Sequence, residues 1–180
     1  MVYILLAEGF EEMEALAPVD LMRRASIEVL TVGVTGKTVY GGHNIGVEAD
    51  ILLEEMDLTQ LEMIVLPGGL GGVASARASQ GAMDALKFAW ENDKFVAAIC
   101  AGPTVLADLH ITDNKQATCY PSCEEQMGSA VMNNQVPCIR DGKLITGASA
   151  GCAIPFALAL IEALKGTEVA KAIEKQIVIR

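Results

Sequence analysis

Cys100 is the residue whose type and place in the chain most clearly suggest chemistry. It follows the apolar run 95–99 and precedes Ala101, Gly102 and Pro103, which suit a tight turn into the first turn of a helix. A sulfur on such an elbow is exposed, and the N-terminus of the next helix favours the thiolate, so we expect a pKa below the free value of about 8.5. A buried structural cysteine is the commoner alternative. The position at a strand end favours a reactive nucleophile.

A glycine pair follows another apolar run. Gly68 and Gly69 come after residues 63–66 and a proline, and their backbone amides have no side chain in the way. Together with the amide of Ala101 they could stabilise an oxyanion or a thiolate beside Cys100. The alternative is a turn that needs glycine only for its dihedral angles.

Three acidic residues stand where the first apolar run ends. Glu11, Glu12 and Glu14 belong to the start of an expected helix, on which Glu12 and Glu14 point in different directions. A carboxyl that faces Cys100 would be pushed toward its protonated form and could relay a proton. Solvated acids at a helix N-terminus are the favoured interpretation for Glu11 or Glu12. The spacing alone does not single out Glu14.

The cysteine count argues against a disulfide framework and against zinc. Five cysteines are an odd number, and no secretory signal accompanies them, so we expect free thiols. Cys119 and Cys123 are a close pair, but His43 and His110 are far away in the sequence and supply no second pair for a four-ligand site. No metal is expected.

The composition excludes several classes of protein. The chain has 180 residues, 52% hydrophobic and only 4% aromatic, with 13 basic and 23 acidic side chains and a net charge of -10. The apolar fraction excludes disorder, and the negative charge disfavours nucleic acid and anionic membranes as partners. The uncharged run 144–161 is interrupted by Gly147 and Pro155, so we expect it to be buried. The first residues lack the charge pattern of a signal peptide, so we expect a cytoplasmic protein.

Buried strands alternate with amphipathic helices along the chain. We expect strands at 2–7, 27–34, 63–66, 95–99 and 116–120, and helices at 11–24, 81–92, 103–109, 150–165 and 168–174. Residues 136–145 should form a hairpin, and residues 36–47 a small hairpin or an irregular excursion. This alternation predicts an α/β sandwich with a mostly parallel sheet and helices on both faces. In such folds the site lies at the carboxyl ends of the strands, where segments 8–14, 67–69 and 100–103 should converge.

The chain resembles the DJ/ThiJ/PfpI superfamily, in the branch of the Parkinsonism-associated protein and its bacterial relatives. The resemblance rests on AEGFEEMEA (7–15), PVDLMRRA (18–25), VLPGG (65–69), AAICAGP (97–103) and FALALIEAL (156–164). It implies a single domain over residues 1–180, a flavodoxin-like three-layer sandwich, and a homodimer. It also implies a nucleophile elbow at Cys100.

The resemblance also implies roles for the neighbours of Cys100. Glu14 matches the family's glutamate that hydrogen-bonds this cysteine, and Gly68, Gly69 and Ala101 match the backbone donors around it. The family's activities need no cofactor. They include glyoxalase III-like conversion of methylglyoxal to lactate and deglycation, as a hydro-lyase or hydrolase, and the sensing of oxidative stress with chaperone-like protection.

Two positions depart from the family's patterns. The peptidase branch has histidine directly after the nucleophile, where this chain has Ala101, so peptidase activity is disfavoured. The deglycase-like branch often has histidine where Tyr120 stands before Pro121. Proton transfer would then fall to Glu14 or a nearby group.

Three further residues are candidates for accessory or interface roles. His43 could approach the site from either subunit, although an exposed loop histidine is the simpler interpretation. Cys119 could approach Cys100 as a resolving thiol. For a dimer interface, the helix from Met13 to Arg24 is more apolar than one contact requires, and Met13, Met22 and Met56 are candidates.

Two functions fit these residues. One is a cysteine-dependent enzyme that acts on small 2-oxoaldehydes or glycated adducts through a Cys100 thiolate assisted by Glu14. The other is a redox-sensing, protective protein whose Cys100 is oxidised to the sulfinate. Both need a small molecule to reach one thiol, and neither needs a nucleic acid or a membrane.

Overall fold

The central strands are continuous apolar runs that are buried on both faces. The computed structural model describes residues 1–179. Its main sheet has seven strands in the order β10-β11-β7-β6-β1-β2-β5. These are β1 (Val2–Leu6), β2 (Val29–Gly33), β5 (Ile51–Leu52), β6 (Met63–Leu66), β7 (Phe95–Ile99), β10 (Cys138–Asp141) and β11 (Leu144–Gly147). Within this described sheet only β10 runs antiparallel to its neighbour.

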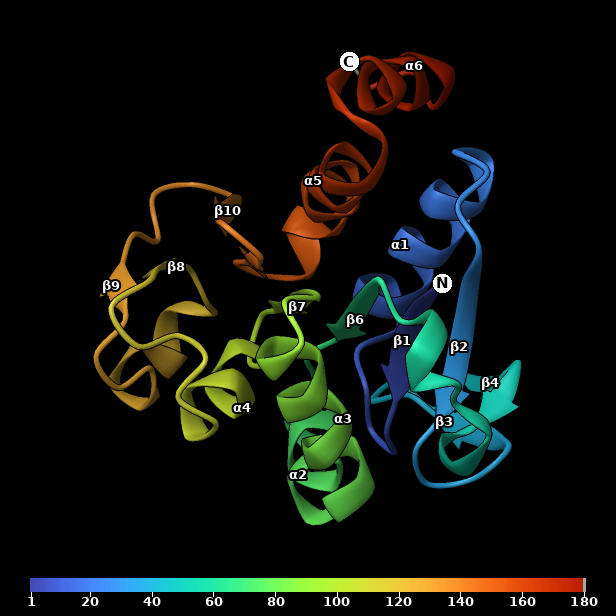
Figure 1. Cartoon of the computed structure of the whole chain (residues 1–180), viewed down its shortest axis with the longest axis vertical. Coiled ribbons are helices and arrows are strands. Elements are labelled where there is room, and N and C mark those ends of the chain that lie inside the picture. The colour runs from blue at the N-terminus through green and yellow to red at the C-terminus, as the bar shows by residue number, and fades with distance from the viewer. Residues whose placement is uncertain (180) are drawn as a thin grey trace.

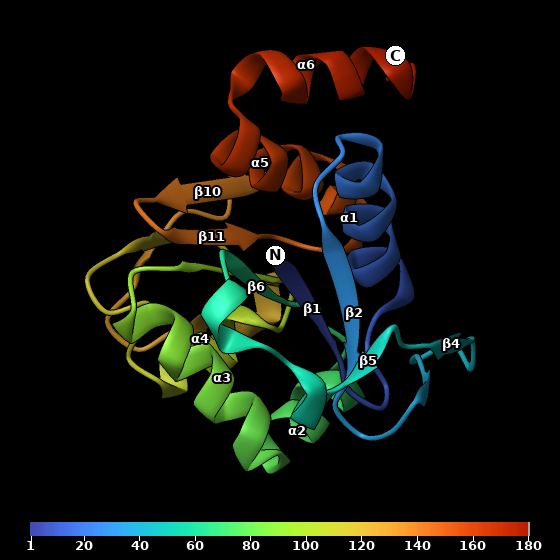
Figure 2. The same cartoon turned by 45° about the vertical axis from the view of Figure 1, so that its right-hand side comes forward.

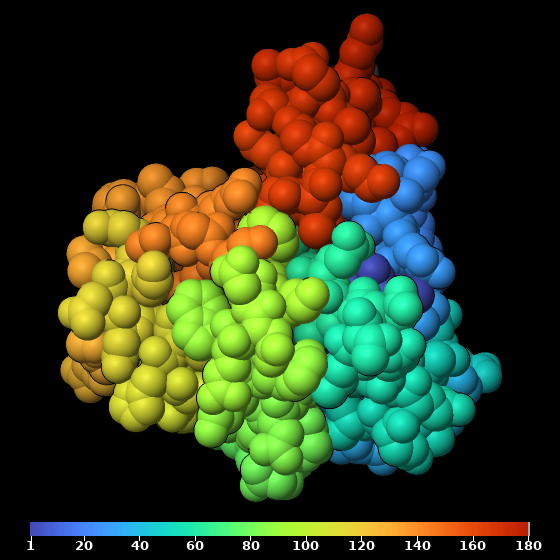
Figure 3. Space-filling view, in the orientation of Figure 1, coloured from blue at the N-terminus to red at the C-terminus, as the bar shows by residue number. Residues whose placement is uncertain are grey.

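Helices cover both faces of this sheet, as Figures 1 and 2 show. The helices α1 (Glu12–Arg24) and α5 (Ala153–Lys165) bury aliphatic side chains against one face, and α6 (Thr167–Gln176) packs on α5. The helices α2 (Leu70–Ala78), α3 (Gln80–Glu91) and α4 (Pro103–Asp108) enclose a second aliphatic core on the other face. In the space-filling view α6 stands out from the body of the molecule (Figure 3). The predicted three-layer α/β sandwich is confirmed.

Shorter elements surround the carboxyl edge of the sheet and its rim. The strands β3 (Thr38–Tyr40) and β4 (Gly46–Glu48) form an antiparallel hairpin, and β8 (Gln116–Ala117) pairs with β9 (Val131–Met132). Short 3-10 helices are η1 (Leu53–Glu55), η2 (Leu58–Gln60), η3 (Pro121–Gln126) and η4 (Ala150–Cys152). Of these segments, η3, η4 and the turn between β3 and β4 carry residues that line the site.

The structure differs from the predicted elements in a few places. Helix α2 was not predicted, because two glycines near its start disfavour a helix in isolation. The predicted strand 116–120 ends at Ala117, where the chain turns toward η3. The second hairpin extends to Gly147 instead of ending at Ile145.

Two expectations about the surface can also be compared with the structure. Met22 is fully buried in the core beneath α1, so its predicted place at a subunit interface is wrong, whereas Met13 is 59% exposed. The uncharged run 144–161 is divided into β11, η4 and part of α5. Within residues 1–179, none of the helices has the length and apolar character to cross a membrane.

Candidate active site

The predicted strand ends do converge, at the point where the strand order reverses. From β1 the chain continues to β2 on one side, and later returns to β6 and β7 on the other side. This leaves a crevice at the carboxyl ends of the central strands, the usual ligand site of such sheets. Backbone hydrogen bonds join the segments there: Glu11 N donates to Gly68 O at 3.0 Å and Tyr120 N to Cys100 O at 2.8 Å.

Cys100 forms a strained elbow between β7 and α4. Its φ of +63° lies in the left-handed region, which costs a residue other than glycine about 1 to 2 kcal/mol. The backbone holds this conformation through Cys100 N, which donates to Gly147 O at 2.9 Å. The amides of Ala101 and Gly69 lie near the half-buried sulfur and act to lower its pKa. Strain of this kind is typical of functional sites.

Glu14 is the acidic residue that reaches the site. Its side chain is fully buried, and Oε2 accepts a hydrogen bond from Gly68 N at 2.8 Å. Among the described residues, Oε1 has no partner within normal hydrogen-bond distance, yet the carboxyl and the Cys100 sulfur shift each other's pKa. The carboxyl and the sulfur are therefore close enough for each to change the charge state of the other.

The two preceding glutamates have other tasks. Glu11 caps α1, where its carboxylate accepts a hydrogen bond from Glu14 N at 2.7 Å and so fixes the first turn. Glu12 points to the other side of the helix and is 5% exposed, so the expectation that it is a solvated acid is wrong. It accepts hydrogen bonds from the backbone N–H of His43 at 2.7 Å and from the His43 ring at 2.8 Å.

The glycine pair serves close packing as well as backbone donation. A Cβ on Gly68 would lie 2.6 Å from Glu14 Oε2 and 2.7 Å from Cys100 Cβ, so any side chain there would separate the two groups. Gly69 has φ +86° and precedes α2, a conformation that glycine adopts without strain. Of the two predicted donors, Gly69 N faces the sulfur, whereas Gly68 N holds Glu14.

The pKa values of the pair oppose the expectation from the sequence. Burial raises the pKa of Glu14 to about 7, although contacts to Cys100 and Gly68 lower it. Burial, followed by the charge and hydrogen bonding of Glu14, raises the pKa of Cys100 to about 12. The predicted depression of the Cys100 pKa is therefore wrong, because desolvation and a nearby carboxylate outweigh the short helix α4 and the two amides. Between pH 7 and 12 the pair shares one proton.

The position of that proton decides whether the site is reactive. When Glu14 carries it, the carboxylate charge that raises the Cys100 pKa is removed, and an O–H donor stands beside the sulfur instead. The thiolate is then stabilised by this donor and by the amides of Gly69 and Ala101. The arrangement can hold a nucleophilic sulfur and a proton donor together.

The accessory candidates from the sequence lie at different depths. Tyr120 is 45% exposed and His43 74% exposed in its side chain, and both line the same cavity as Cys100. The hydrogen bond and the charge of Glu12 raise the pKa of His43. Cys119 is fully buried, its sulfur lies 3.4 Å from Tyr120 O, and it does not line the cavity. The predicted approach of Cys119 to Cys100 is not seen.

The cavity around Cys100 has a volume of about 670 Å³. Besides the predicted residues, Glu11 among them, its lining includes Leu70, Ser122, Cys123, Ser149, Ala150 and Gly151. These were missed because they come from loops and helix ends that carry no periodic pattern. Cys123 was noted only as a neighbour of Cys119, and its place in η3, after a proline, gave no indication of which way its sulfur points.

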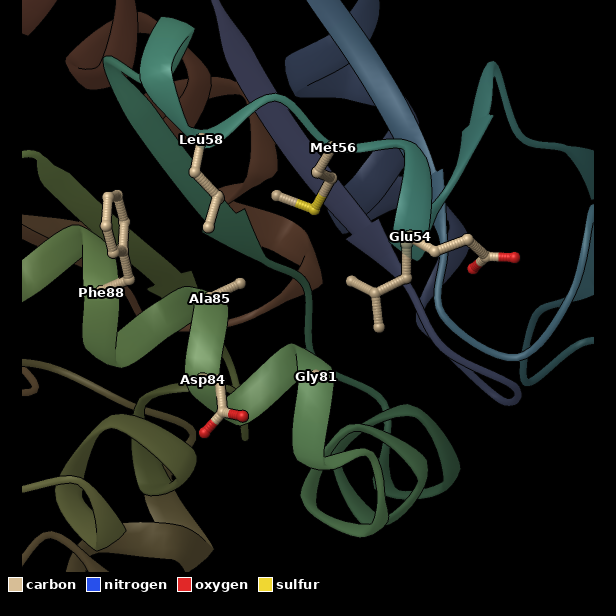
Figure 4. A pocket seen from close by; sticks show the side chains of 8 residues that line it. Glu54, Met56, Leu58, Gly81, Asp84, Ala85 and Phe88 are labelled. Carbon is tan, nitrogen blue, oxygen red and sulfur yellow. The ribbon is translucent and has the colours of Figure 1, made fainter.

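A second hollow, shown in Figure 4, lies away from Cys100 between η1, η2 and α3. Met56 and Leu58 face Ala85 and Phe88 across about 410 Å³. Its described lining contains no cysteine, histidine or hydroxyl group, and its titratable side chains are the carboxylates of Glu54 and Asp84. Thiol chemistry therefore belongs to the Cys100 cavity.

One group in residues 1–179 has the spacing of a metal site. Possible ligand atoms of Glu11, Glu12 and His43 all lie within 4.8 Å of one another. Glu11 is used as a helix cap, and both oxygens of Glu12 already accept hydrogen bonds from His43. The group is therefore explained by local structure.

Comparisons with known proteins agree with the fold. The DJ-1/PfpI family matches residues 1–163. Protein dj-1beta of Drosophila melanogaster is 35% identical over 180 residues, which cover 98% of this chain and 95% of that protein. The crystal structure of Drosophila melanogaster DJ-1beta superposes with a TM-score of 0.94 at 33% identity, over 99% of this chain and 97% of that one. The flavodoxin-like fold is thereby confirmed.

Other relatives differ in length or in described activity. A deglycase of Pyrococcus abyssi is 30% identical over 129 residues, which cover 72% of this chain and 77% of that protein. Protein DJ-1 homolog B of Arabidopsis thaliana is 34% identical, and the chain spans 91% of its own length but 37% of that longer protein.

The shared proton predicts the pH dependence of Cys100 alkylation. In the wild type, the logarithm of the iodoacetamide rate should rise up to pH about 7, where the pair loses its first proton, and stay flat toward pH about 12. In Glu14→Gln the break near pH 7 should vanish. The rate should keep rising to a pKa below that of the wild type, because the charge that raised it is gone.

Glu11→Gln is the matched control for this experiment. The charge of Glu11 raises the pKa of Glu14, so this variant should keep the break and move it to slightly lower pH. A break that stays at the same pH in Glu14→Gln would contradict the coupling of Glu14 with Cys100.

Proposed function

The chain belongs to the DJ-1/PfpI family, and we propose that it is a cysteine-dependent enzyme that converts small 2-oxoaldehydes, or their glycation adducts, into hydroxy acids. The observation that supports this most directly is the buried Glu14 carboxyl beside the Cys100 sulfur, with the amides of Gly69 and Ala101 on the same sulfur. Nucleophile, proton carrier and oxyanion donors all come from the chain itself. The described lining of the cavity has no lysine or arginine, which suits a neutral carbonyl compound.

The first step is attack of the Cys100 thiolate on the aldehyde carbon of methylglyoxal. A C–S bond forms, the carbonyl π electrons move to oxygen, and the proton held by Glu14 neutralises the resulting alkoxide. The amides of Gly69 and Ala101 are the donors nearest to the developing charge. The product is a hemithioacetal, and Glu14 is left as a carboxylate.

The second step moves a proton between adjacent carbons. The Glu14 carboxylate removes the proton from the former aldehyde carbon, giving an enediolate, and returns it to the neighbouring carbon, while the hydroxyl proton passes from the first oxygen to the second. The result is a thioester of lactate on Cys100. A group with a pKa near 7 can both take and give this proton at neutral pH.

The last step is hydrolysis. Water adds to the thioester carbonyl, the C–S bond breaks, and lactate leaves while Cys100 and Glu14 recover one shared proton. The sum of the steps is methylglyoxal plus water to lactate and one proton, which is released to solvent. The cavity of about 670 Å³ is open enough for larger adducts, which agrees with the relative described as a deglycase.

Turnover of methylglyoxal by purified protein tests this function. Cys100→Ala should lower kcat by about a thousandfold or more, since Cys100 carries the sulfur that stands beside Glu14 and the amides of Gly69 and Ala101. Glu14→Gln should lower kcat by about a hundredfold, because an amide cannot carry the proton between carbons. Lactate formation is the measurement.

Cys138→Ala is the matched control, because Cys138 does not line the cavity. It should retain the wild-type rate. Equal rates for the wild type and Cys100→Ala would rule out the proposed reaction.

A second function is favoured by the unpartnered Oε1 of Glu14. A sulfinate on Cys100 carries two added oxygens, and a protonated Glu14 could donate a hydrogen bond to one of them. Cys100 would then act as a sensor of oxidative stress in a protective protein. The half-buried sulfur is reached through the open cavity, whereas the Cys119 thiol is fully buried.

Mass spectrometry after excess peroxide tests the sensor function. We expect addition of about 32 Da at Cys100, ahead of the other four cysteines. In Glu14→Gln the sulfinate should form more slowly, because the amide does not stabilise it as a protonated carboxyl does. Uniform oxidation of all five thiols would exclude selective sensing.

We also propose a homodimer, which the resemblance of the motifs implies. Met13 on α1 and Ile154 on α5 are 59% and 42% exposed and line a shared apolar hollow of about 370 Å³. Ala150 and Gly151 line both this hollow and the Cys100 cavity. A second copy that covers the hollow would therefore stand at the edge of the site.

Light scattering tests the dimer. The wild type should have the mass of two chains, and Ile154→Glu should shift it to one chain, because a buried unpaired carboxylate is costly. Val131→Glu, at another exposed apolar position, should leave the dimer intact. A wild type with the mass of one chain would exclude the dimer.

A further inference from the structure

Two sulfur atoms share the cavity of the site. All five cysteines lie within the described residues, and only Cys100 and Cys123 line this cavity. Cys123 is 5% exposed, so it is reached through the cavity and hardly from bulk solvent. The proposed reactions make no use of it.

The backbone ties the turn that carries Cys123 to the Cys100 elbow. Tyr120 N donates to Cys100 O at 2.8 Å, which places the two chain segments side by side. Cys123 N then donates to Tyr120 O, also at 2.8 Å, so that Cys123 stays within one turn of the residue bonded to Cys100. Contact between Asn134 and Glu124 holds the next residue of this turn.

We propose that Cys123 is the resolving thiol of this site, which captures the sulfenic acid formed when a hydroperoxide oxidises Cys100 and closes a reversible Cys100–Cys123 disulfide. The proposal rests on the redox function of Cys100 and adds to it a second residue and a reversible product. It replaces Cys119 in the role that the sequence suggested, because Cys119 lies outside the cavity.

The chemistry balances with a hydroperoxide as the only co-reactant. The Cys100 thiolate attacks the distal peroxide oxygen, the O–O bond breaks, and the alcohol or water leaves with the proton held by Glu14. Cys100 is then a sulfenic acid, oxidised by two electrons. The Cys123 sulfur attacks the Cys100 sulfur, the S–O bond breaks, and one water leaves with the Cys123 proton.

The other thiols are placed less well for this step. The Cys119 sulfur is fully buried and lies 3.4 Å from Tyr120 O, behind the cavity wall. Cys138 packs against the core on the α1 and α5 side, and Cys152 contacts Ser149 Oγ at 3.6 Å. Neither lines the cavity in which the sulfenic acid forms.

Formation of the disulfide changes the oxidation product of Cys100 at low hydroperoxide concentration. The sulfinate needs a second equivalent of hydroperoxide, whereas capture by Cys123 needs none. One equivalent should therefore give the disulfide, which thiols reduce, and a large excess should drive part of the protein to the sulfinate, which they do not.

To test the proposal, the full chain is treated with one equivalent of hydrogen peroxide and its free thiols are blocked with N-ethylmaleimide. Its peptides are then mapped by mass spectrometry without reduction. We expect the Cys100 and Cys123 peptides joined, about 2 Da lighter than their sum. A second sample of each protein receives two equivalents, which the sulfinate requires, and in Cys123→Ala the joined pair is lost and Cys100 gains about 32 Da. After dithiothreitol, recovery of Cys100 alkylation should be about tenfold greater in the wild type than in Cys123→Ala.

Cys152→Ala is the matched control and should keep the joined peptides. A sulfinate on Cys100 in equal amounts in the wild type and Cys123→Ala would overturn the proposal, as would a disulfide from Cys119 to Cys123. A disulfide requires Cα atoms within about 7 Å of each other. If the segments of Cys100 and Cys123 do not come that close in solution, the wild type and Cys123→Ala should form equal amounts of sulfinate, which overturns the proposal.

A Cys100 that peroxide leaves unmodified would overturn both the disulfide and the redox function. Methylglyoxal turnover of reduced protein is measured separately, so failure of the enzymatic proposal is recognised independently.

Discussion

The contact between the buried Glu14 carboxyl and the Cys100 sulfur is the constraint on which the rest of the site depends. A carboxyl out of water must keep its proton or find donors, and Glu14 has one donor, Gly68 N, at 2.8 Å. Position 68 cannot hold a side chain, because a Cβ would lie under 3 Å from both groups. Helix α1 must begin where it does, with Glu11 as its cap, so that Glu14 points inward. The strained elbow of Cys100 then brings the sulfur to the same place.

The electrostatics of this pair explain why one site can support two kinds of chemistry. Burial raises both pKa values, to about 7 for Glu14 and about 12 for Cys100, so the pair keeps one proton in the physiological range. A thiolate that stands beside a proton donor can add to an aldehyde, or attack a peroxide whose leaving group needs a proton. Which reaction occurs depends on the molecule that enters the cavity. Cys123, on the same cavity wall, adds a route by which the oxidised state is returned to the thiol.

The surroundings of the pair divide into a rigid part and a loop part. Strands β1, β6 and β7 are buried on both faces and hold the segments that carry Glu14, Gly68 and Cys100. The other walls come from η3, η4 and the β3–β4 hairpin, which the Glu12–His43 pair ties to α1. Residues on these loops set the size and polarity of the cavity. The reacting pair can thus stay fixed in position while the loops accommodate different carbonyl compounds or adducts.

The sequence by itself determined the order of the central elements and the candidate nucleophile, because continuous apolar runs and a small-residue turn after a strand have a direct local signature. The glycine pair and the acidic turn were found for the same reason. Only the tertiary structure decided which glutamate faces the sulfur, that Gly68 holds Glu14, and that the pKa of Cys100 rises. These depend on burial and on distances between segments far apart in the chain, which local spacing does not encode. The same holds for Cys123: its neighbour Cys119 has the same residue type, and only the path of the loop from Tyr120 puts one sulfur in the cavity and the other behind its wall.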